Sequence, residues 1–371
     1  MIVLALLALL VWLTLIAGRG GFWRDGERLA PARPLLAMPV AVVVPARDEA
    51  EVVGASIGSL LAQDYPGTVR IILVDDGSAD ATASIARGLA GAERLTVLAA
   101  TPCPEGWTGK LWAVQQGVAA TEEEFLLLTD ADVVHDPAHL SALVAHAERG
   151  GFDLVSEMVA LNCESLAERA LVPAFVYLFA ALYPFAWIRD PLRTTAAAAG
   201  GTMLIRRAAL ERIGGIAAIR GALIDDVALA RAVKRDGRIW LGHSRLARSV
   251  RRYPGFADIW RMVARSAYVQ LRHSPLALVL TTLALALVFL VPVLAALFGH
   301  GLGRACGLAS WAIMAASFLP TLARYRLSPF WAAALPAIVA FYAAATLDSA
   351  ADHHLGRGVE WKRRTYPGPA P

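Results

Sequence analysis

The chain has 371 residues and a net charge of only +4; 57% of its residues are hydrophobic and 18% are charged. Soluble domains are usually about 45–50% apolar and about 25% charged, so this composition, with a mean hydropathy of +0.52, argues against a purely soluble protein and excludes a disordered one. Three cysteines without metal-like spacing exclude a disulfide scaffold, and the small net charge gives no indication of a nucleic-acid partner despite a pI of about 9.1.

Residues 1–18 contain no charged residue and are nearly as long as the roughly 20 residues that cross a bilayer. No basic residue precedes this apolar run and no small-residue cleavage site follows it, so an uncleaved transmembrane anchor is favoured over a signal peptide. Residues 19–38 contain four arginines and two prolines and are predicted to be a linker. By the positive-inside rule, these arginines place the next domain, residues 39–275, in the cytoplasm.

Apolar, β-branched runs alternate with helical periods through the first part of this domain. Strands are predicted at Val40–Val44, Val69–Val74, Leu95–Leu98 and Phe125–Leu128. One helix is predicted at Glu51–Leu61. A second is predicted to follow the N-cap residue Asp80 and to run to Leu89, and a third to follow the N-cap residue Asp136, with Pro137 in its first turn. This alternation predicts an α/β fold with a Rossmann-like, mostly parallel sheet.

Polar residues follow these strands, where sheets of this kind bind their ligands. They are Pro45-Ala46-Arg47-Asp48-Glu49 after the first strand, Asp75-Asp76-Gly77-Ser78 after the second and Asp130-Ala131-Asp132 after the fourth. Carboxylates gathered at one edge repel one another unless a cation neutralises them. Asp130 and Asp132 can both face one hard cation, which predicts Mg²⁺ or Mn²⁺ held together with an anionic ligand; a turn cap is the alternative for this pair.

Residues 166–188 form a further apolar run, rich in aromatic residues and bounded by Arg169 and Arg189. A spanning helix here would reverse the side of everything downstream, so a helix lying in the plane of the bilayer surface is favoured. A buried core helix is the alternative.

Three more uncharged stretches, residues 276–299, 305–323 and 327–347, predict C-terminal transmembrane helices. Seven arginines between residues 245 and 272 precede them, in agreement with a cytoplasmic domain. Pro329 and Pro336 interrupt the last stretch, so it either crosses the bilayer or re-enters it. The side of the basic tail, residues 348–371 with Arg357, Lys362, Arg363 and Arg364, stays open.

Four motifs in order, VVVPARDEAEVV, ILVDDGSADAT, GWTGKLWAVQQG and LLLTDADVVHDP, resemble those of family 2 glycosyltransferases with the GT-A fold. The resemblance covers about residues 38–255. The runs AAAAGGTMLIRR and GGIAAIRGALIDD are similar to the branch associated with hopanoid biosynthesis. The resemblance implies a GT-A nucleotide-diphospho-sugar transferase with N-terminal and C-terminal transmembrane helices, multi-pass in the bacterial plasma membrane.

The resemblance also implies roles for individual residues. Those expected to bind the nucleotide are Pro45, Arg47, Glu49, Asp75 and Asp76. Lys110 is expected to reach the diphosphate or the sugar, as suits a lysine near a helix N-terminus; a solvated lysine is the alternative. Asp130 is expected to contact ribose and metal, and Asp132 to be the principal metal ligand. Gly200 and Gly201 would let the backbone approach the sugar, and His135 is either another ligand or a residue at the start of a helix.

The catalytic base is expected in the acidic pair Asp225-Asp226, where Asp226 aligns with the residue that takes the acceptor's proton. Family members usually have Glu-Asp here, so Asp225 is a conservative departure; an N-cap is an equally compatible role for Asp226. The Gln-x-x-Arg-Trp motif of processive synthases is absent, which favours a single transfer. Arg261 and Arg265, one helical turn apart, are expected to face phosphate or, as we favour, anionic lipid.

Together these features predict an inverting glycosyltransferase that uses a nucleotide-diphosphate sugar, with a UDP-sugar favoured, and Mg²⁺ or Mn²⁺. Flanking membrane segments favour a lipid acceptor, and the resemblance makes it a hopanoid. Alternatives are a ceramide-like or polyprenyl acceptor, or a non-catalytic nucleotide-binding membrane protein. A transporter is disfavoured because the uncharged stretches contain no ionisable acidic or basic side chains.

Overall fold

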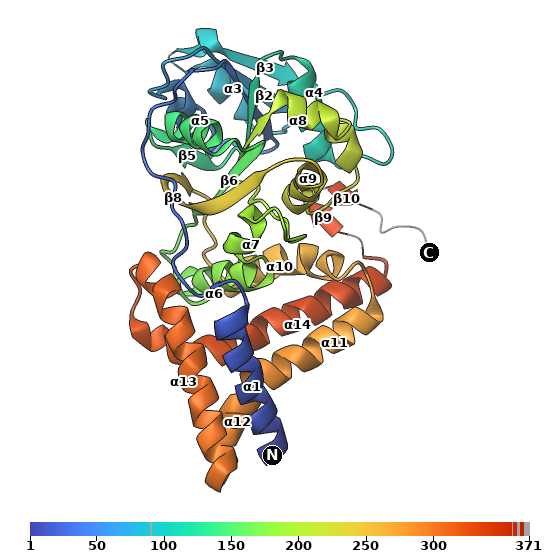
Figure 1. The fold of residues 1–371 in the computed structure, drawn as a ribbon. Coiled ribbons are helices and arrows are strands. Elements are labelled where there is room, and N and C mark those ends of the chain that lie inside the picture. The colour runs from blue at the N-terminus through green and yellow to red at the C-terminus, as the bar shows by residue number, and fades with distance from the viewer. Residues whose placement is uncertain (90, 358, 362–363, 367–371) are drawn as a thin grey trace. The chain divides into compact units, whose positions relative to one another are not determined.

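The computed structural model describes residues 1–89, 91–357, 359–361 and 364–366 (Figure 1). The chain divides into two compact units. A sheet unit comprises Glu27–Asn162 and Trp187–Arg252, and a helical unit comprises Met1–Gly26, Cys163–Ala186 and Tyr253–Pro371. These limits correct the continuous domain predicted at 39–275, because residues 163–186 and those from 253 onward cluster with the helices.

The sheet unit is built on eight strands in the order β3-β2-β1-β4-β7-β6-β8-β5. In chain order they are β1 Val40–Ala46, β2 Val69–Asp75, β3 Leu95–Ala99, β4 Phe125–Thr129, β5 Val133–His135, β6 Leu154–Ala160, β7 Thr202–Arg206 and β8 Ile239–Ser249. The half from β3 to β4 is parallel, as predicted. The other half is mixed, since β7 runs antiparallel to β4 and β6, and β5 runs antiparallel to β8.

The middle of the parallel half is buried on both faces, because β1 and β4 consist almost entirely of apolar residues. In β1, for example, Val40 to Val44 are fully buried. The helices of this unit are α2 Val53–Leu61, α3 Thr82–Arg87, α4 Gly109–Ala119, α5 His139–Gly150, α8 Arg207–Arg212 and α9 Asp225–Lys234, with 3₁₀ turns at Ala92–Arg94 and Ile216–Ile219. Gly117 allows α4 to pack closely on the sheet, because a Cβ there would lie 2.4 Å from Val43 Cγ1.

Three helices begin later than the sequence predicts. The helix α2 starts at Val53 rather than Glu51. The side chain of Asp80 accepts hydrogen bonds from Thr82, but the residue that precedes α3 is Ala81. Similarly, Asp136 accepts from the backbone N–H of Ala138, and α5 begins only at His139.

The helical unit contains α1 Ile2–Gly18, α6 Leu166–Leu182, α10 Phe256–Gln270, α11 Pro275–Leu285, α12 Val291–Phe298, α13 Gly301–Arg324 and α14 Leu335–His354. A π turn, Ala286–Leu290, joins α11 to α12, and a 3₁₀ turn, Pro329–Ala334, precedes α14. By length and apolarity, Pro275–Phe298, Gly301–Arg324 and Pro329–His354 are each able to cross a membrane. The apolar helix α1 is shorter and packs against α12 and α13 (Figure 1).

The apolar run predicted at 166–188 is not one helix. It ends as α6 at Leu182, and a short helix α7, Phe185–Arg189, follows. Within the helical unit, α6 is a packed core helix: Tyr177 Oη lies 2.6 Å from Ser317 Oγ of α13, and Tyr342 of α14 donates to the backbone oxygen of Leu171. This geometry corresponds to the buried-helix alternative.

The C-terminal residues are partly helical. Because α14 runs to His354, the predicted tail at 348–371 starts as helix, and two short antiparallel strands, β9 Val359–Trp361 and β10 Arg364–Tyr366, follow. Of the basic residues predicted in the tail, Lys362 and Arg363 lie outside the described residues.

Candidate active site

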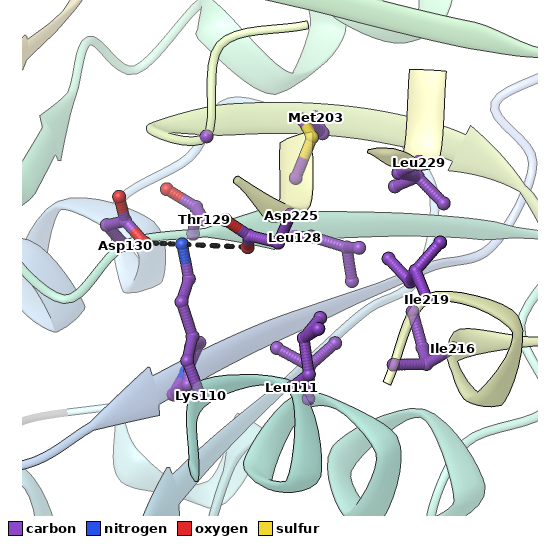
Figure 2. A pocket seen from close by; sticks show the side chains of 13 residues that line it. Lys110, Leu111, Leu128, Thr129, Asp130, Met203, Ile216, Ile219, Asp225 and Leu229 are labelled. Carbon is purple, nitrogen blue, oxygen red and sulfur yellow. Dashed lines mark ion pairs between the residues drawn. The ribbon is translucent and has the colours of Figure 1, made fainter. Parts of the chain in front are cut away.

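Lys110 lies between two carboxylates that come from distant parts of the chain. It is the second residue of α4, which begins after Thr108, whose hydroxyl accepts from the Leu111 N–H. Its Nζ lies 2.9 Å from Asp130 Oδ1, just after β4, and 3.1 Å from Asp225 Oδ2, at the start of α9 (Figure 2). The lysine is therefore not a solvated side chain but the cation that joins three elements.

The charges around Lys110 shift the pKa values of this group of residues. Burial alone would lower the pKa of Lys110, but Asp130 and Asp225 raise it far above its ordinary value, so the ammonium stays charged. Burial raises the pKa of Asp130, repulsion from Asp132 and Asp225 adds to this, and Lys110 opposes it. The repulsion from Asp132 fits the expectation that these two carboxylates lie close together.

Asp226 is held by the backbone beside this ion pair. Its Oδ2 accepts a 2.9 Å hydrogen bond from the Gly200 N–H, and its Oδ1 accepts from the Val227 N–H at 2.7 Å. It lies in the first turn of α9, which follows Ile224, so it is not the N-cap residue. Burial and the neighbouring Asp225 raise the pKa of Asp226 to about 7, against the opposing effect of Lys110.

A pocket lies over Lys110 at the ends of β1 and β4 (Figure 2). One side is polar and includes Asp130 and Asp225, and the other side is apolar. The pocket is lined by Pro45, Lys110, Leu111, Val114, Leu128, Thr129, Asp130, Gly200, Met203, Ile216, Ile219, Asp225 and Leu229. It brings together four of the residues expected to act in the reaction: Pro45, Lys110, Asp130 and Asp225.

Asp132 and Glu49 share one guanidinium. Arg251 Nε lies 2.7 Å from Asp132 Oδ2, and its Nη2 lies 2.7 Å from Glu49 Oε1. Ser249 also donates to Asp132 Oδ2, at 3.2 Å. The sequence counts Arg251 only as a positive charge before the membrane helices, because the strand β8 that carries it to the site is not recognised in advance.

The loops after β1 and β2 interlock. Arg47 donates to the backbone oxygen of Asp76, and its Nη1 lies 3.9 Å from the buried Asp76 carboxylate. Asp75 Oδ1 accepts from the Ser78 N–H, and the Asp48 N–H donates to Ser78 Oγ. The structure therefore brings Arg47, Asp75 and Asp76 together, as expected of a shared nucleotide pocket.

The remaining predicted residues lie elsewhere. The side chain of His135 is 3% exposed and lies between Thr129 and His139, so it points into the protein interior. Gly201 contributes its backbone oxygen, which accepts from the Thr129 hydroxyl. Arg261 and Arg265 belong to the helical unit, where both are exposed on α10 and Arg261 pairs with Asp258.

Two curated proteins share part of this sequence. Dodecaprenyl-phosphate galacturonate synthase of Rhizobium johnstonii is 32% identical over 124 residues, which are 33% of this chain and 36% of that protein. The 4,4'-diaponeurosporenoate glycosyltransferase of Staphylococcus aureus (strain USA300) is 34% identical over 95 residues, 25% of this chain and 24% of that protein. The chain thus spans about a third or less of the length of these relatives.

The fold is shared over more of the chain. A mannosyltransferase from Pyrobaculum calidifontis, solved in complex with GDP-Man and Mn2+, matches with a TM-score of 0.58 and 20% identity, over 94% of this chain and 99% of that one. Residues 41–214 match the family model described as glycosyl transferase family 2. The chain therefore has the GT-A fold, and its residues 41–214 are similar to glycosyl transferase family 2.

Proposed function

We propose that the protein is a membrane-bound inverting glycosyltransferase that moves one sugar from a nucleotide-diphosphate sugar, with a UDP-sugar as the favoured donor, to a lipid. One observation carries this proposal. The Asp226 carboxylate, with a pKa of about 7, is fixed by the Gly200 N–H beside the ion pair of Lys110. A base and a cation placed together at the strand ends suit a displacement that releases a diphosphate.

Asp226 is the proposed general base. A base is most effective when its pKa lies near the working pH, and such help typically gives 10²–10⁴-fold in rate. As the acceptor oxygen attacks the anomeric carbon, its proton passes to a carboxylate oxygen of Asp226. The bond from that carbon to the diphosphate oxygen breaks, and the configuration at the carbon inverts.

Lys110 is proposed to hold the leaving diphosphate. Its ammonium stays charged at neutral pH, and it lies near the N-terminus of α4, where backbone N–H groups also favour anions. Asp130 and Asp225 orient the ammonium before the donor binds.

A divalent cation fits the acidic residues between β4 and β5. Asp130 and Asp132 offer hard carboxylate oxygens, and each is now neutralised by a side-chain cation, Lys110 or Arg251. Among the described residues no three His, Cys, Asp or Glu side chains surround one point, so phosphate and water would complete the ligand set. When bound, Mg²⁺ or Mn²⁺ would neutralise charge on the leaving diphosphate.

The nucleotide is proposed to bind at the interlocked loops after β1 and β2. Arg47 and Asp76 are already paired there, Asp75 is fixed by Ser78, and Glu49 is fixed by Arg251. Pro45 lines the adjacent pocket, which would receive the sugar.

The acceptor is proposed to be a lipid. Three helices are able to cross a membrane, which supports a multi-pass protein of the bacterial plasma membrane with its sheet unit in the cytoplasm. The names of the two curated relatives include a dodecaprenyl phosphate and a diaponeurosporenoate. Within this class the sequence resemblance favours a hopanoid over a ceramide-like or polyprenyl acceptor. Arg261 and Arg265 are proposed to contact anionic headgroups.

The test is transfer by the full-length protein in detergent or liposomes, with a panel of labelled nucleotide sugars and hopanoid, polyprenyl-phosphate and ceramide acceptors. We expect one donor to yield a singly glycosylated lipid in a Mn²⁺- or Mg²⁺-dependent reaction, and Asp132→Asn to abolish it. Failure of every donor to label any lipid, under conditions where the protein binds a nucleotide diphosphate, would contradict the proposed function.

A further inference from the structure

Four polar side chains form a buried row beneath the connection between β4 and β5. They come from four elements: Glu157 from β6, His139 from the start of α5, His135 from the end of β5 and Thr129 from the end of β4. Glu157 and His139 are 0% exposed, Thr129 is 2% and His135 is 3% exposed. The reaction proposed above uses none of these side chains.

The row is continuous. Glu157 Oε1 lies 2.6 Å from His139 Nε2, the two histidine Nδ1 atoms are 2.9 Å apart, and His135 Nε2 lies 3.3 Å from Thr129 Oγ1. The Thr129 hydroxyl then lies 2.7 Å from the backbone oxygen of Gly201. In the described part of the chain neither carboxyl oxygen of Glu157 forms a hydrogen bond, nor does His139 Nε2, so the close contact with His139 Nε2 joins the carboxyl group to the row.

The directions of these hydrogen bonds follow from the last acceptor of the row, the backbone oxygen of Gly201. A carbonyl can only accept, so the single hydroxyl proton of Thr129 is donated to Gly201. Nε2 of His135 must then donate to Thr129. Burial, together with the neighbouring His139, lowers the pKa of His135, which is therefore neutral, and its Nδ1 accepts from His139.

The row ends at the residues that hold the base and the lysine. The backbone oxygen of Gly201 also accepts from the Asp130 N–H at 3.4 Å, which joins the end of β4 to the start of β7. The preceding residue, Gly200, donates its N–H to Asp226. Ser156, next to Glu157 in β6, accepts a hydrogen bond from the Ala199 N–H. The row thus ends on the Gly201 backbone oxygen, which is also bonded to Asp130 and is adjacent to the residue that holds Asp226.

We propose that Glu157, His139 and His135 are positioning residues, which act through Thr129 to hold the Gly200–Gly201 backbone against Asp130 and so fix Asp226 relative to Lys110. Burying four polar groups is costly, and apolar side chains would fill the same space at lower cost. A buried polar row of this kind instead specifies one geometry. The inference rests on the proposed function and assigns His135 a role other than metal ligand.

Thr129→Val is the first test, because valine has the shape of threonine but neither donates nor accepts. The assay uses the donor and the lipid that the transfer panel described above identifies. We expect kcat to fall by at least about tenfold, since a displacement near 1 Å can cost ~10²-fold, while the donor KM changes by less than about threefold. Thr129→Ser keeps the hydroxyl and should restore kcat to within about threefold of wild type.

Thr121→Val is the matched control. The Thr121 hydroxyl also donates to a backbone oxygen, that of Val118 at 2.8 Å, and accepts from a side chain, Arg207 Nη2 at 2.9 Å. It is buried as well, but it does not line the pocket. We expect Thr121→Val to leave kcat unchanged. Equal losses of kcat in the two valine variants would mean that the row has only a structural role, and would overturn the proposal.

Two substitutions of His135 test whether Thr129 acts by positioning the Gly200–Gly201 backbone or by contacting the substrate itself. The amide of glutamine reaches about as far as imidazole Nε2, so His135→Gln keeps a donor to Thr129, whereas the shorter asparagine of His135→Asn does not. We expect His135→Asn to lower kcat as Thr129→Val does, and His135→Gln to lower it less. Wild-type kcat in both His135→Asn and Thr129→Val would overturn the inference alone, whereas a wild-type protein that transfers no sugar would overturn the proposed function and the inference with it.

Discussion

At the scale of single residues, the pKa of Asp226 reflects opposing influences from a few neighbours. Burial and Asp225 favour its protonated form, whereas Lys110 and the N–H groups of Gly200 and Val227 favour the carboxylate. The result is a pKa of about 7, compared with an ordinary value of 3.8. Near neutral pH a substantial fraction of Asp226 is therefore ionised and able to accept a proton.

The pH dependence of the reaction follows from this balance. Because only the ionised base accepts a proton, kcat/KM should rise with pH and level off above a pKa near 7. Asp225→Asn removes a charge that raises the pKa of Asp226 and releases Lys110 from one partner, and both effects favour the carboxylate. The acid limb of kcat/KM, measured from pH 5 to pH 9, should move to lower pH in this variant. An unchanged or higher midpoint would contradict the assignment.

At the scale of elements, the backbone before β7 shapes the site. Gly200 faces the reacting groups: a Cβ built there would lie 3.4 Å from Asp226 Oδ2 and 3.6 Å from Lys110 Nζ. The sequence predicts that the two glycines make room for the donor sugar. The structure shows Gly200 making room for the base and the lysine.

Gly200→Ala should place a methyl group in van der Waals contact with these two side chains without unfolding the protein. We expect kcat to fall by about tenfold, because Gly200 lines the pocket and the methyl group would displace the substrate there, with little change in thermal stability. Gly58→Ala, in α2, adds a methyl group with no neighbour within 4 Å and is the matched control. Normal turnover in Gly200→Ala would show that the substrate does not occupy the space beside Gly200.

The sequence predicts those strands of the sheet that are marked by local runs of apolar residues. The strands β1, β2 and β4 are short, mostly apolar runs that stop near a proline or aspartate, and the strand-end rule then places Asp75, Asp130 and Asp132 at one edge. The strand β6 escapes prediction because Ser156 and Glu157 interrupt its apolar pattern, and their buried partners are distant in sequence. Antiparallel β7 likewise depends on pairings that no local period reveals.

The candidate site is predictable to the same extent. Lys110 and Asp226 come from the resemblance to a family, and the structure places them with Asp130 and Asp225. Arg251 is not predictable, because its role depends on the preceding strand β8, whose second half contains Arg245 and Arg248 and is not an apolar run. A long-range contact of this kind has no signature in the local sequence.

Arg251 occupies the carboxylates of Asp132 and Glu49, and should compete with a metal ion for them. We expect Arg251→Gln to tighten Mn²⁺ binding in the absence of nucleotide by about fivefold, corresponding to the roughly 1 kcal/mol of a partly exposed ion pair. Calorimetry or electron paramagnetic resonance of the full-length protein measures this directly. Arg245→Gln, at an exposed position of the same strand, loses the same charge and should leave the affinity unchanged. Weaker Mn²⁺ binding in Arg251→Gln alone would show that the arginine supports the site instead of competing for it.

At the scale of the whole molecule, the two units differ in how many large apolar side chains they expose. The sheet unit buries most of its large apolar residues, whereas α11 exposes large aliphatic side chains such as Leu280 and Leu283, 57% and 61% exposed. Exposed leucines on a helix long enough to span a bilayer are typical of a lipid-facing surface. The sequence predicts the three C-terminal spans but not their breaks: the π turn at Ala286–Leu290 and the 3₁₀ turn at Pro329–Ala334 are details of packing.

Leu283→Arg tests this surface. A charged residue at the centre of a spanning helix costs about 2.5–3.5 kcal/mol on insertion scales, so the variant should be depleted from carbonate-washed membranes. Leu192→Arg, at a loop position of the sheet unit that is 90% exposed, carries the same change and should remain in the membrane fraction at the wild-type level. Equal recovery of the two variants would argue against a lipid-facing α11.

The most direct measurement for the whole account is sugar transfer by Asp226→Asn, with nucleotide-sugar binding measured on the same preparation. The account predicts that transfer falls by at least about 10²-fold, the lower range for loss of a general base, while the donor dissociation constant stays within about threefold of the wild-type value. Asparagine keeps the shape of the side chain and its acceptor oxygen toward Gly200, so the fold should persist. Wild-type turnover by Asp226→Asn would contradict the account, because no base would then be needed at the position that the proposal assigns to it.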